Sequence, residues 1–376
     1  MEFRDLKTQY LKNKNKIDCA VLKVFENTNF ISGNEVKQLE KRLAEYVGVK
    51  HCITCANGTD ALSLVLSAWG IGKGDAVFVP DFTFFATAEI VTYAGATPIF
   101  VEVDETTFNI NPDQLEYQIK KIKDEGLLNP KVIIPVDLFG LLANYKEIER
   151  LAKKHNLLIL EDGAQGFGAE YKGRKACSFG DAASTSFFPA KPLGCYGDGG
   201  AIFTNNTELA SLLESLRVHG KGEDKYDNVR IGVNSRLDTL QAAILNVKLD
   251  AFIEHELQDV NLVYSKYNDK LSDFVKTPYI PEGYISSFAQ YTIQLNSKEE
   301  RDNLKKYLSE FSIPSMIYYT KPMHRQTAFS DLNFNDEDYP VSTQLCERVL
   351  SLPMHPYLSD EDINTIASKV IEFLHK

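Results

Sequence analysis

A single lysine, Lys191, lies in a loop between an apolar run that contains two phenylalanines and a cluster of four glycines. The run begins at Ser184, and the glycines lie between Gly194 and Gly200. Such a loop can enclose one amine while its backbone approaches a ligand closely. An amine that has lost its hydration gives up its proton more easily and can condense with an aldehyde. The alternative is an exposed loop lysine, which is the usual place of this residue.

A carboxylate, Asp162, follows the apolar run at residues 157–160. At the carboxyl end of a buried parallel strand, its side chain would point into the crevice where α/β proteins bind ligands. There it can keep a ring nitrogen protonated. An N-cap of the next helix is the alternative. The neighbouring Glu161 is aimed elsewhere, because side chains alternate along a strand.

A third group of residues has the properties of an anion site. The segment Asn57-Gly58-Thr59 follows a predicted strand and opens a predicted helix. Free backbone amides and the helix dipole attract negative charge at such a place. Gly58 lets the backbone approach a phosphate, and the hydroxyls of Thr59 and Ser186 add donors. An ordinary helix cap is the alternative.

An aromatic side chain in the segment 81–88 can cover a planar ligand, and we select Phe84. Core packing explains Phe82 and Phe85 equally well. A lysine, a carboxylate, an anion site and a stacking surface are what pyridoxal phosphate requires of a protein. Because each candidate lies at a predicted strand end, the set predicts a pyridoxal-phosphate enzyme in which Lys191 and Asp162 are catalytic.

The elements that would position these residues alternate along the first two thirds of the chain. Short apolar runs and amphipathic helices follow one another, which indicates a mostly parallel sheet covered on both faces. We expect helices at 34–47, 59–69, 84–95, 112–125 and 144–155. We expect strands at 51–55, 76–79, 97–103, 131–136, 157–160, 184–188 and 201–204.

The pattern changes after residue 234. Long charged helices at 235–273 precede strands at 289–295 and 313–319, and helices follow near 298–310 and 360–374. This part resembles a smaller α+β unit. The predicted domains are a large cofactor-binding α/β/α domain, 1–250, and a small C-terminal domain, 251–376.

The composition is that of an ordinary globular protein, with 44% hydrophobic and 25% charged residues. A formal net charge of -11 without a basic block argues against nucleic acid or an anionic membrane as partner. No apolar stretch approaches the roughly 20 residues of a membrane span, and no signal peptide is readable. Cys52 and Cys55 form an isolated C-x-x-C that we interpret as a buried strand, not a metal site. We therefore expect a cytoplasmic protein without a metal.

Several longer motifs are specific. They are Cys55-Ala-Asn-Gly-Thr-Asp-Ala-Leu62, Glu161-Asp-Gly-Ala-Gln165, the segment 185–201 around the lysine, Val233-Asn-Ser-Arg-Leu-Asp-Thr-Leu-Gln-Ala-Ala243 and Ser351-Leu-Pro-Met-His-Pro356. Through them the chain resembles, almost end to end, the DegT/StrS-type nucleotide-sugar aminotransferases. This resemblance implies the fold of the fold-type-I pyridoxal-phosphate enzymes.

The resemblance also implies a role for each site residue. Lys191 would form the Schiff base with the cofactor and move the proton, and Asp162 would pair with the pyridine nitrogen. Asn234 would reach the phosphate of the partner subunit, so that a homodimer shares its active sites. The remaining implied cofactor contacts are Gly58, Thr59 and Ser186 at the phosphate, Phe84 at the ring face and Gln165 at the ring hydroxyl.

For the reaction, the resemblance implies transfer of an amino group from L-glutamate to a nucleotide-linked keto sugar for a surface polysaccharide. Enzymes acting on UDP-2-acetamido-2-deoxy-3-oxo-D-glucuronate are the most similar, and there Arg236 and Tyr319 would contact the sugar. The family commonly has His-Tyr-Pro where this chain has Tyr318-Tyr319-Thr320. A 3-keto sugar without the carboxylate and a 4-keto sugar therefore stay open as substrates.

Two different activities also stay open. Some family members have histidine in place of the lysine and act as dehydratases, whereas this chain keeps Lys191. The second is that of a regulatory protein without turnover. His219, before a Gly/Lys/Asp-rich stretch, and His324 are candidate substrate contacts, although a structural role is the first interpretation of both. His355 is interpreted as structural.

Overall fold

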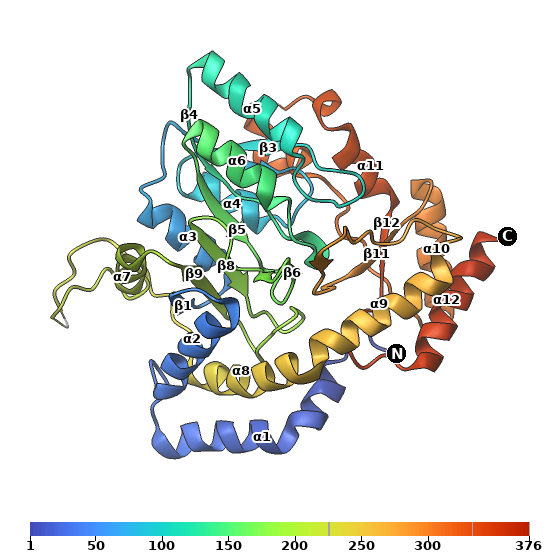
Figure 1. The fold of residues 1–376 in the computed structure, drawn as a ribbon, viewed down its shortest axis with the longest axis horizontal. Coiled ribbons are helices and arrows are strands. Elements are labelled where there is room, and N and C mark those ends of the chain that lie inside the picture. Colours follow the sequence, from blue (N-terminus) through green and yellow to red (C-terminus); the bar gives the residue numbers. More distant parts are fainter. Residues whose placement is uncertain (225, 333, 376) are drawn as a thin grey trace.

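The computed structural model describes residues 1–224, 226–332 and 334–375 (Figure 1). Its helices are α1 (Leu6–Asn27), α2 (Asn34–Val47), α3 (Gly58–Ala68), α4 (Ala86–Tyr93), α5 (Pro112–Glu125), α6 (Tyr145–His155), α7 (Thr207–Leu216), α8 (Thr239–Ala251), α9 (Leu257–Leu271), α10 (Lys298–Glu310), α11 (Pro340–Arg348) and α12 (Asp360–Leu374). Its strands are β1 (His51–Cys55), β2 (Asp75–Pro80), β3 (Thr97–Val101), β4 (Asn129–Ile133), β5 (Leu158–Asp162), β6 (Glu170–Tyr171), β7 (Arg174–Lys175), β8 (Ala182–Ser186), β9 (Gly200–Thr204), β10 (Tyr284–Ile285), β11 (Tyr291–Gln294) and β12 (Val349–Leu352).

A seven-stranded sheet lies at the centre of the molecule, with the strand order β1-β9-β8-β5-β4-β2-β3. The strands from β8 to β3 pair in parallel, whereas β9 runs antiparallel to both of its neighbours. Most positions in these strands are buried, because apolar runs in such a sheet are covered on both faces. The mostly parallel sheet predicted from the sequence is confirmed, with one reversed strand.

Helices cover both faces of this sheet. On one face α3, α4 and α7 pack on the strands, and Leu62, Ile90 and Leu213 belong to the shared apolar core. On the other face α5 and α6 cover one half of the sheet, and α2 and α8 cover the other half. α1 lies on the outer side of α8, at the bottom of Figure 1. These layers form an α/β/α fold.

The C-terminal part of the chain has an apolar core of its own. α9, α10 and α12 pack around the paired strands β11 and β12. α8 continues into α9 through a π-helical turn at Phe252–Glu256, so that one helical path joins the two cores (Figure 1). The helices predicted at 298–310 and 360–374 are confirmed. The domain boundary predicted at residue 250 falls near the end of α8 and stays a prediction.

The strand predicted at 313–319 is wrong. In this segment, which the structure describes completely, a single isolated bridge joins Met316 to Ser351. Ser312 has a left-handed backbone with a φ of 57°. Pro314 lacks the amide hydrogen that a ladder requires. Together these two residues interrupt the pairing.

An extended segment projects from the body of the molecule beside α7 (Figure 1). We call residues 218–224 and 226–233 the arm. A bridge between Val218 and Asn234 closes its base. Ile231 is 94% exposed. Val229 and Val233 of the arm are exposed as well.

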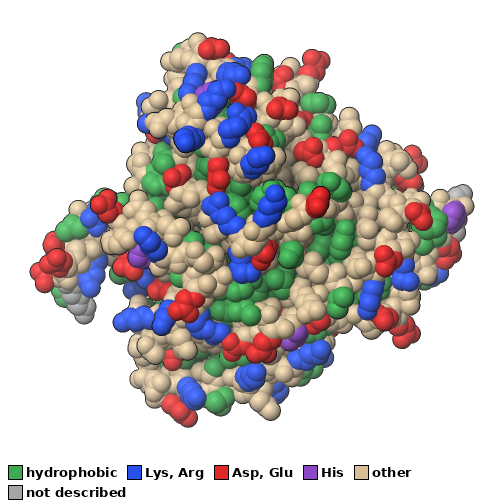
Figure 2. Space-filling model, in the orientation of Figure 1, with side chains coloured by type: hydrophobic (Ala, Val, Ile, Leu, Met, Phe, Trp, Pro, Cys, Tyr) green, Lys and Arg blue, Asp and Glu red, His purple; other side chains and the backbone are tan. Residues whose placement is uncertain are grey.

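Acidic and basic side chains are interspersed on the face shown in Figure 2. This pattern offers a polyanion no continuous basic area on that face. Within the described residues, no helix is both long and apolar enough to cross a membrane.

Candidate active site

Two neighbouring strand ends and one helix start bring the predicted residues together. β5 ends at Asp162 and β8 ends at Ser186, with Asp162 opposite Ser184 in the register. α3 begins at Gly58, directly against Ser186. Lys191 lies in the loop from β8 to β9. The residues thus gather at the carboxyl edge of the sheet, where α/β folds bind ligands.

Asp162 is a buried carboxylate with fixed partners. One of its oxygens accepts a hydrogen bond from the Thr87 hydroxyl (2.9 Å), and the other accepts one from the Ala164 amide (3.2 Å). The Thr87 hydroxyl lies 3.2 Å from that of Thr83. Burial raises the pKa of Asp162, whereas the two hydrogen bonds and the charge of Lys191 lower it. Such a carboxylate has a defined orientation toward any ring nitrogen placed before it.

Lys191 is partly buried, and its backbone amide donates to the Phe188 carbonyl (2.9 Å). Burial lowers the pKa of its amine, and the charge of Asp162 opposes this shift. A lower pKa increases the share of neutral amine, which is the nucleophilic form. Lys191 and Asp162 are near enough for the charge of each to act on the pKa of the other.

Backbone atoms approach one another closely at the start of α3. A Cβ on Gly58 would lie 2.8 Å from the Cβ of Ser186, and a Cβ on Gly200 would lie 2.4 Å from the Asn57 carbonyl oxygen. Asn57 caps the helix with its side chain. The amides of Gly58 and Thr59 stand at the helix N-terminus, close to Ser186. We call Gly58, Thr59 and Ser186 the cradle. The space that a Cβ on Gly58 would fill leaves room for a phosphate.

Aromatic rings and one amide gather around Tyr319. The rings of Phe82 and Phe84 lie 5.8 Å and 6.4 Å from that of Tyr319. Phe84 is 54% exposed and Phe82 is buried, so Phe84 is the ring accessible to a ligand. Gln165 donates to the Tyr319 hydroxyl (3.1 Å), and its oxygen accepts from the Phe139 amide (2.8 Å). These two partners hold the Gln165 side chain in one orientation.

Three predicted contact residues lie at or beside the arm. Asn234 is exposed at its base, His219 is exposed within it, and Arg236 is partly exposed just beyond it. None of the three forms a side-chain hydrogen bond with the lysine–aspartate pair in the part of the chain that the structure describes. The hydroxyl of Ser235 donates to a carboxylate of α3 (2.6 Å) and ties this segment to the cradle. The roles of the three residues stay predictions.

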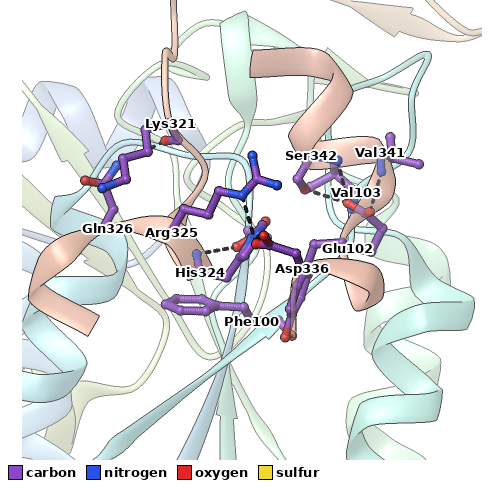
Figure 3. A network of polar contacts seen from close by, with 12 residues as sticks. Phe100, Glu102, Val103, Lys321, His324, Arg325, Gln326, Asp336, Val341 and Ser342 are labelled. Carbon is purple, nitrogen blue, oxygen red and sulfur yellow. Dashed lines mark hydrogen bonds and ion pairs between the residues drawn. The ribbon is translucent and has the colours of Figure 1, made fainter. Parts of the chain in front are cut away.

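His324 is held between two carboxylates. Its Nδ1 lies 2.7 Å from Asp81. Its Nε2 lies 3.0 Å from Asp336, which Figure 3 shows beside it. Its ring stacks on Tyr339, with centroids 4.5 Å apart. Asp81 begins the segment that carries Phe84, so the contact with His324 helps to fix the position of that segment. Both ring nitrogens are engaged within the protein, and the contact with substrate that we predicted for His324 stays a prediction.

Sequence reasoning missed two threonines and one arginine. Thr83 and Thr87 are four residues apart where the chain passes from a strand end into α4, and their hydroxyls lie 3.2 Å apart. That spacing is the signal that could have found them. Arg4 donates from Nη2 to the carbonyl oxygen of Lys191 (3.1 Å). No local pattern signals a contact between residues 187 positions apart.

The model of the DegT/DnrJ/EryC1/StrS aminotransferase family matches residues 12–371. This chain belongs to that family. It is 44% identical to the UDP-2-acetamido-2-deoxy-3-oxo-D-glucuronate aminotransferase of Pseudomonas aeruginosa, over 98% of this chain and 99% of the relative. It is 41% identical to the UDP-N-acetyl-3-dehydro-alpha-D-glucosamine 3-aminotransferase of Acidithiobacillus ferrooxidans, over 99% and 97%. The crystal structure of a DegT DnrJ EryC1 StrS aminotransferase from Brucella abortus matches with a TM-score of 0.97 at 50% identity, covering 100% of both chains.

Members of this family are pyridoxal-phosphate-dependent aminotransferases, and so is this enzyme. The residues at the strand ends fit the cofactor. The cradle presents backbone amides at a helix N-terminus, Asp162 is a buried carboxylate, and Lys191 is an amine of lowered pKa, which are groups that pyridoxal phosphate requires. The family, the fold type and the aminotransferase activity predicted from the motifs are confirmed.

Proposed function

We propose that Lys191 and Asp162 are the catalytic residues, and that the enzyme moves an amino group from L-glutamate to a keto carbon of a nucleotide-linked sugar. The observation that carries the assignment is a buried carboxylate that shares one site with a partly buried amine of lowered pKa, beside the cradle. Lysine side chains are mostly exposed, so an amine withdrawn from water in this way calls for an explanation.

Each residue has a defined task in this proposal. Pyridoxal phosphate, when bound, supplies an aldehyde that receives the amino group and a ring that accepts electrons. Asp162 keeps the ring nitrogen protonated, which strengthens that acceptance. The Lys191 amine transfers a proton between the substrate carbon that carries the nitrogen and the cofactor carbon. The remaining cofactor contacts are assigned to Gly58, Thr59 and Ser186 at the phosphate, Phe84 at the ring face and Gln165 at the ring hydroxyl.

The P. aeruginosa and A. ferrooxidans relatives support a 3-keto sugar bound to UDP. Their names specify a 3-oxo and a 3-dehydro sugar, one with a uronate carboxyl and one without. We assign UDP-2-acetamido-2-deoxy-3-oxo-glucuronate, or a related 3-keto sugar, as acceptor, with the product made in the cytoplasm for a surface polysaccharide. Arg236 and Tyr319, with His219 and His324 as further candidates, are the proposed sugar contacts. We assign to Arg236 the contact with the carboxylate of a uronate.

One relative favours a different class of function. It is the pleiotropic regulatory protein of Geobacillus stearothermophilus, 41% identical over 98% of this chain. This chain nevertheless keeps Lys191 and Asp162 beside a cradle that only glycine permits. A protein that regulates without turnover has no need of this combination. We therefore favour the enzyme.

We also propose a homodimer in which Asn234 reaches the phosphate of the partner subunit. A cavity of about 750 Å³ is lined by residues of α3 and α4 together with Ile231 and Val233 of the arm. The two apolar side chains of the arm are exposed in the single chain, as at surfaces that close on a second copy. Ile231→Glu should give a monomer by analytical ultracentrifugation with little amino transfer; a dimer of normal activity would contradict this proposal.

The catalytic assignment can be tested by absorption spectroscopy. The cofactor-loaded protein should lose its visible band on addition of L-glutamate, and a UDP-linked 3-keto sugar should restore it. Lys191→Ala should abolish both changes, whereas the matched Lys153→Ala, which removes an exposed lysine, should leave both intact. Amino transfer at the wild-type rate by Lys191→Ala would overturn the mechanism. A visible band that does not change on addition of L-glutamate would overturn the assignment of glutamate as the amino donor.

A further inference from the structure

The N-terminal segment reaches the backbone of the Lys191 loop through one side chain. Arg4 donates from Nη2 to the carbonyl oxygens of Lys191 (3.1 Å) and Pro192 (3.4 Å). Its Nη1 donates to the carbonyl oxygen of Met354 (3.5 Å). The planar guanidinium has donors on both branches, so it can hold two backbone segments at a fixed separation. It therefore joins the loop of the large domain to a segment that borders the C-terminal core.

Chain termini are usually poorly ordered unless something ties them down. Here the Phe3 carbonyl accepts a hydrogen bond from the Met354 amide (3.3 Å), and the Phe3 ring lies 6.3 Å from that of Tyr318. On the other side, Asp5 caps α1 by accepting from the Thr8 amide (2.8 Å). Arg4 thus lies between two fixed neighbours and has little freedom to leave its partners.

The buried carboxylate of Glu256 lies near enough to the Arg4 guanidinium to act on its pKa. Burial lowers the pKa of Arg4, and the charge of Glu256 opposes this. Glu256 lies in the π-helical turn and accepts hydrogen bonds from Gln9 and from the Tyr357 hydroxyl. Arginine stays charged under such conditions. A charged donor makes stronger hydrogen bonds to carbonyl groups than a neutral one does.

The effect of Arg4 on the reactive amine is mechanical. Burial and the charge of Asp162 are what shift the pKa of Lys191. Arg4 bonds instead to the carbonyl group of Lys191 itself, at the base of the side chain. A change in that carbonyl position moves the whole lysine relative to Asp162.

We propose that Arg4 is a positioning residue for Lys191, and that the N-terminal segment is a strap that holds the Lys191 loop at a fixed place beside the C-terminal core. This inference rests on the proposed catalytic role of Lys191. It adds a residue that lies outside the cofactor and substrate contacts assigned above. It also gives the first residues of the chain a part in the reaction.

The test compares three variants of the full-length enzyme. Arg4→Met removes the hydrogen-bond donors and the charge. Arg4→Lys keeps the charge but not the two-branched set of donors. Lys7→Met removes an exposed cation from the same segment and is the control. The first readout is hydrogen exchange of residues 188–197 in the protein without cofactor. The second is the pH midpoint of the visible band of the loaded protein. The third is the single-turnover rate with L-glutamate and its half-saturating concentration.

We expect Arg4→Met to speed exchange in the loop, to shift the pH midpoint and to slow the half-reaction by about tenfold or more. The half-saturating glutamate concentration should change far less. Arg4→Lys should recover only part of the rate, and Lys7→Met should match the wild type. If Arg4→Met fails to fold, the hydrogen exchange of the loop and the pH midpoint of the visible band in Arg4→Lys decide whether Arg4 positions Lys191.

Two results would overturn the proposal. One is unchanged exchange and pH midpoint in both Arg4 variants. The other is full recovery by Arg4→Lys, which would assign the effect to charge. A wild-type protein that does not react with glutamate would instead refute the proposed donor, and the exchange measurement would still decide the role of Arg4.

Discussion

Gly58→Ala tests whether the cradle depends on the close contact between α3 and β8. The added Cβ would lie 2.8 Å from the Cβ of Ser186. Carbon atoms pack at about 3.5 to 4.0 Å, so the helix start and the strand end must separate by roughly 0.7 to 1.2 Å. Displacement of this size removes a hydrogen bond to the charged phosphate, worth about 1.5 to 3 kcal/mol. The Kd for pyridoxal phosphate should therefore rise roughly 10- to 150-fold.

The assay is titration of the cofactor-free protein with pyridoxal phosphate, followed by the visible band. Ser186→Gly is the matched partner, because it removes the atom that the new Cβ would strike. Ser186→Gly alone should weaken binding through the lost hydroxyl. In the Ser186→Gly background, Gly58→Ala should raise the Kd for pyridoxal phosphate by less than about threefold. A double-mutant cycle measures this difference as a coupling between the two residues.

Two results would refute the steric reasoning. The first is a Gly58→Ala protein that binds the cofactor as tightly as the wild type does. The second is a full penalty for Gly58→Ala in the Ser186→Gly background. Thermal unfolding of each variant controls for a general loss of stability. A variant that unfolds early would be compared at a lower temperature.

Three further predictions concern buried groups. His324→Ala removes the ring that lies 2.7 Å from the buried Asp81 carboxylate but keeps the backbone amide that donates to it, and it should lower the free energy of unfolding by about 1 to 3 kcal/mol in urea; His324→Asn should cost less. Burial, reinforced by Arg4, lowers the pKa of His355 to about 4; because the unfolded chain then binds the extra proton, stability should fall as the pH drops from about 6.5 to 4, by up to roughly 1.4 kcal/mol per pH unit, and His355→Asn should flatten that slope. Burial raises the pKa values of Asp137 and of the neighbouring Glu161, so the folded pair holds a proton that the unfolded chain releases near pH 4, and stability should fall as the pH rises above about 4. In Asp137→Asn the free energy of unfolding should fall less steeply with rising pH than in the wild type. Equal slopes would contradict the prediction.

The sheet could be predicted because its signals are local. From β1 to β5 the strands alternate with helices of ordinary length, and the parallel arrangement of β2 to β5 follows from that alternation. The carboxyl ends of parallel strands meet at one edge, so Asp162 and Ser186 could be placed together before any contact was known. Their convergence with Gly58 and Lys191 therefore followed from topology.

Elements whose burial is sparse or distant could not be predicted. The buried residues of α1, Gln9, Ile17 and Val24, are seven or eight positions apart and give no continuous apolar stripe. This helix is fixed by α8, more than 200 residues further along the chain. Pairs such as Asp81 with His324 also lack a local signal, because the fold alone brings them together.

The reversed strand β9 sets an order of events during synthesis. β1 lies at the edge of the sheet and pairs with β9, with Cys55 opposite Gly200. At roughly 5 to 20 residues per second, the roughly 145 residues between them take about 7 to 30 s to leave the ribosome. During that time β1 has no partner strand. α1 likewise lacks α8, the helix on which it packs. A nascent chain released before residue 200 would carry an open strand edge that nothing in the fragment can cover.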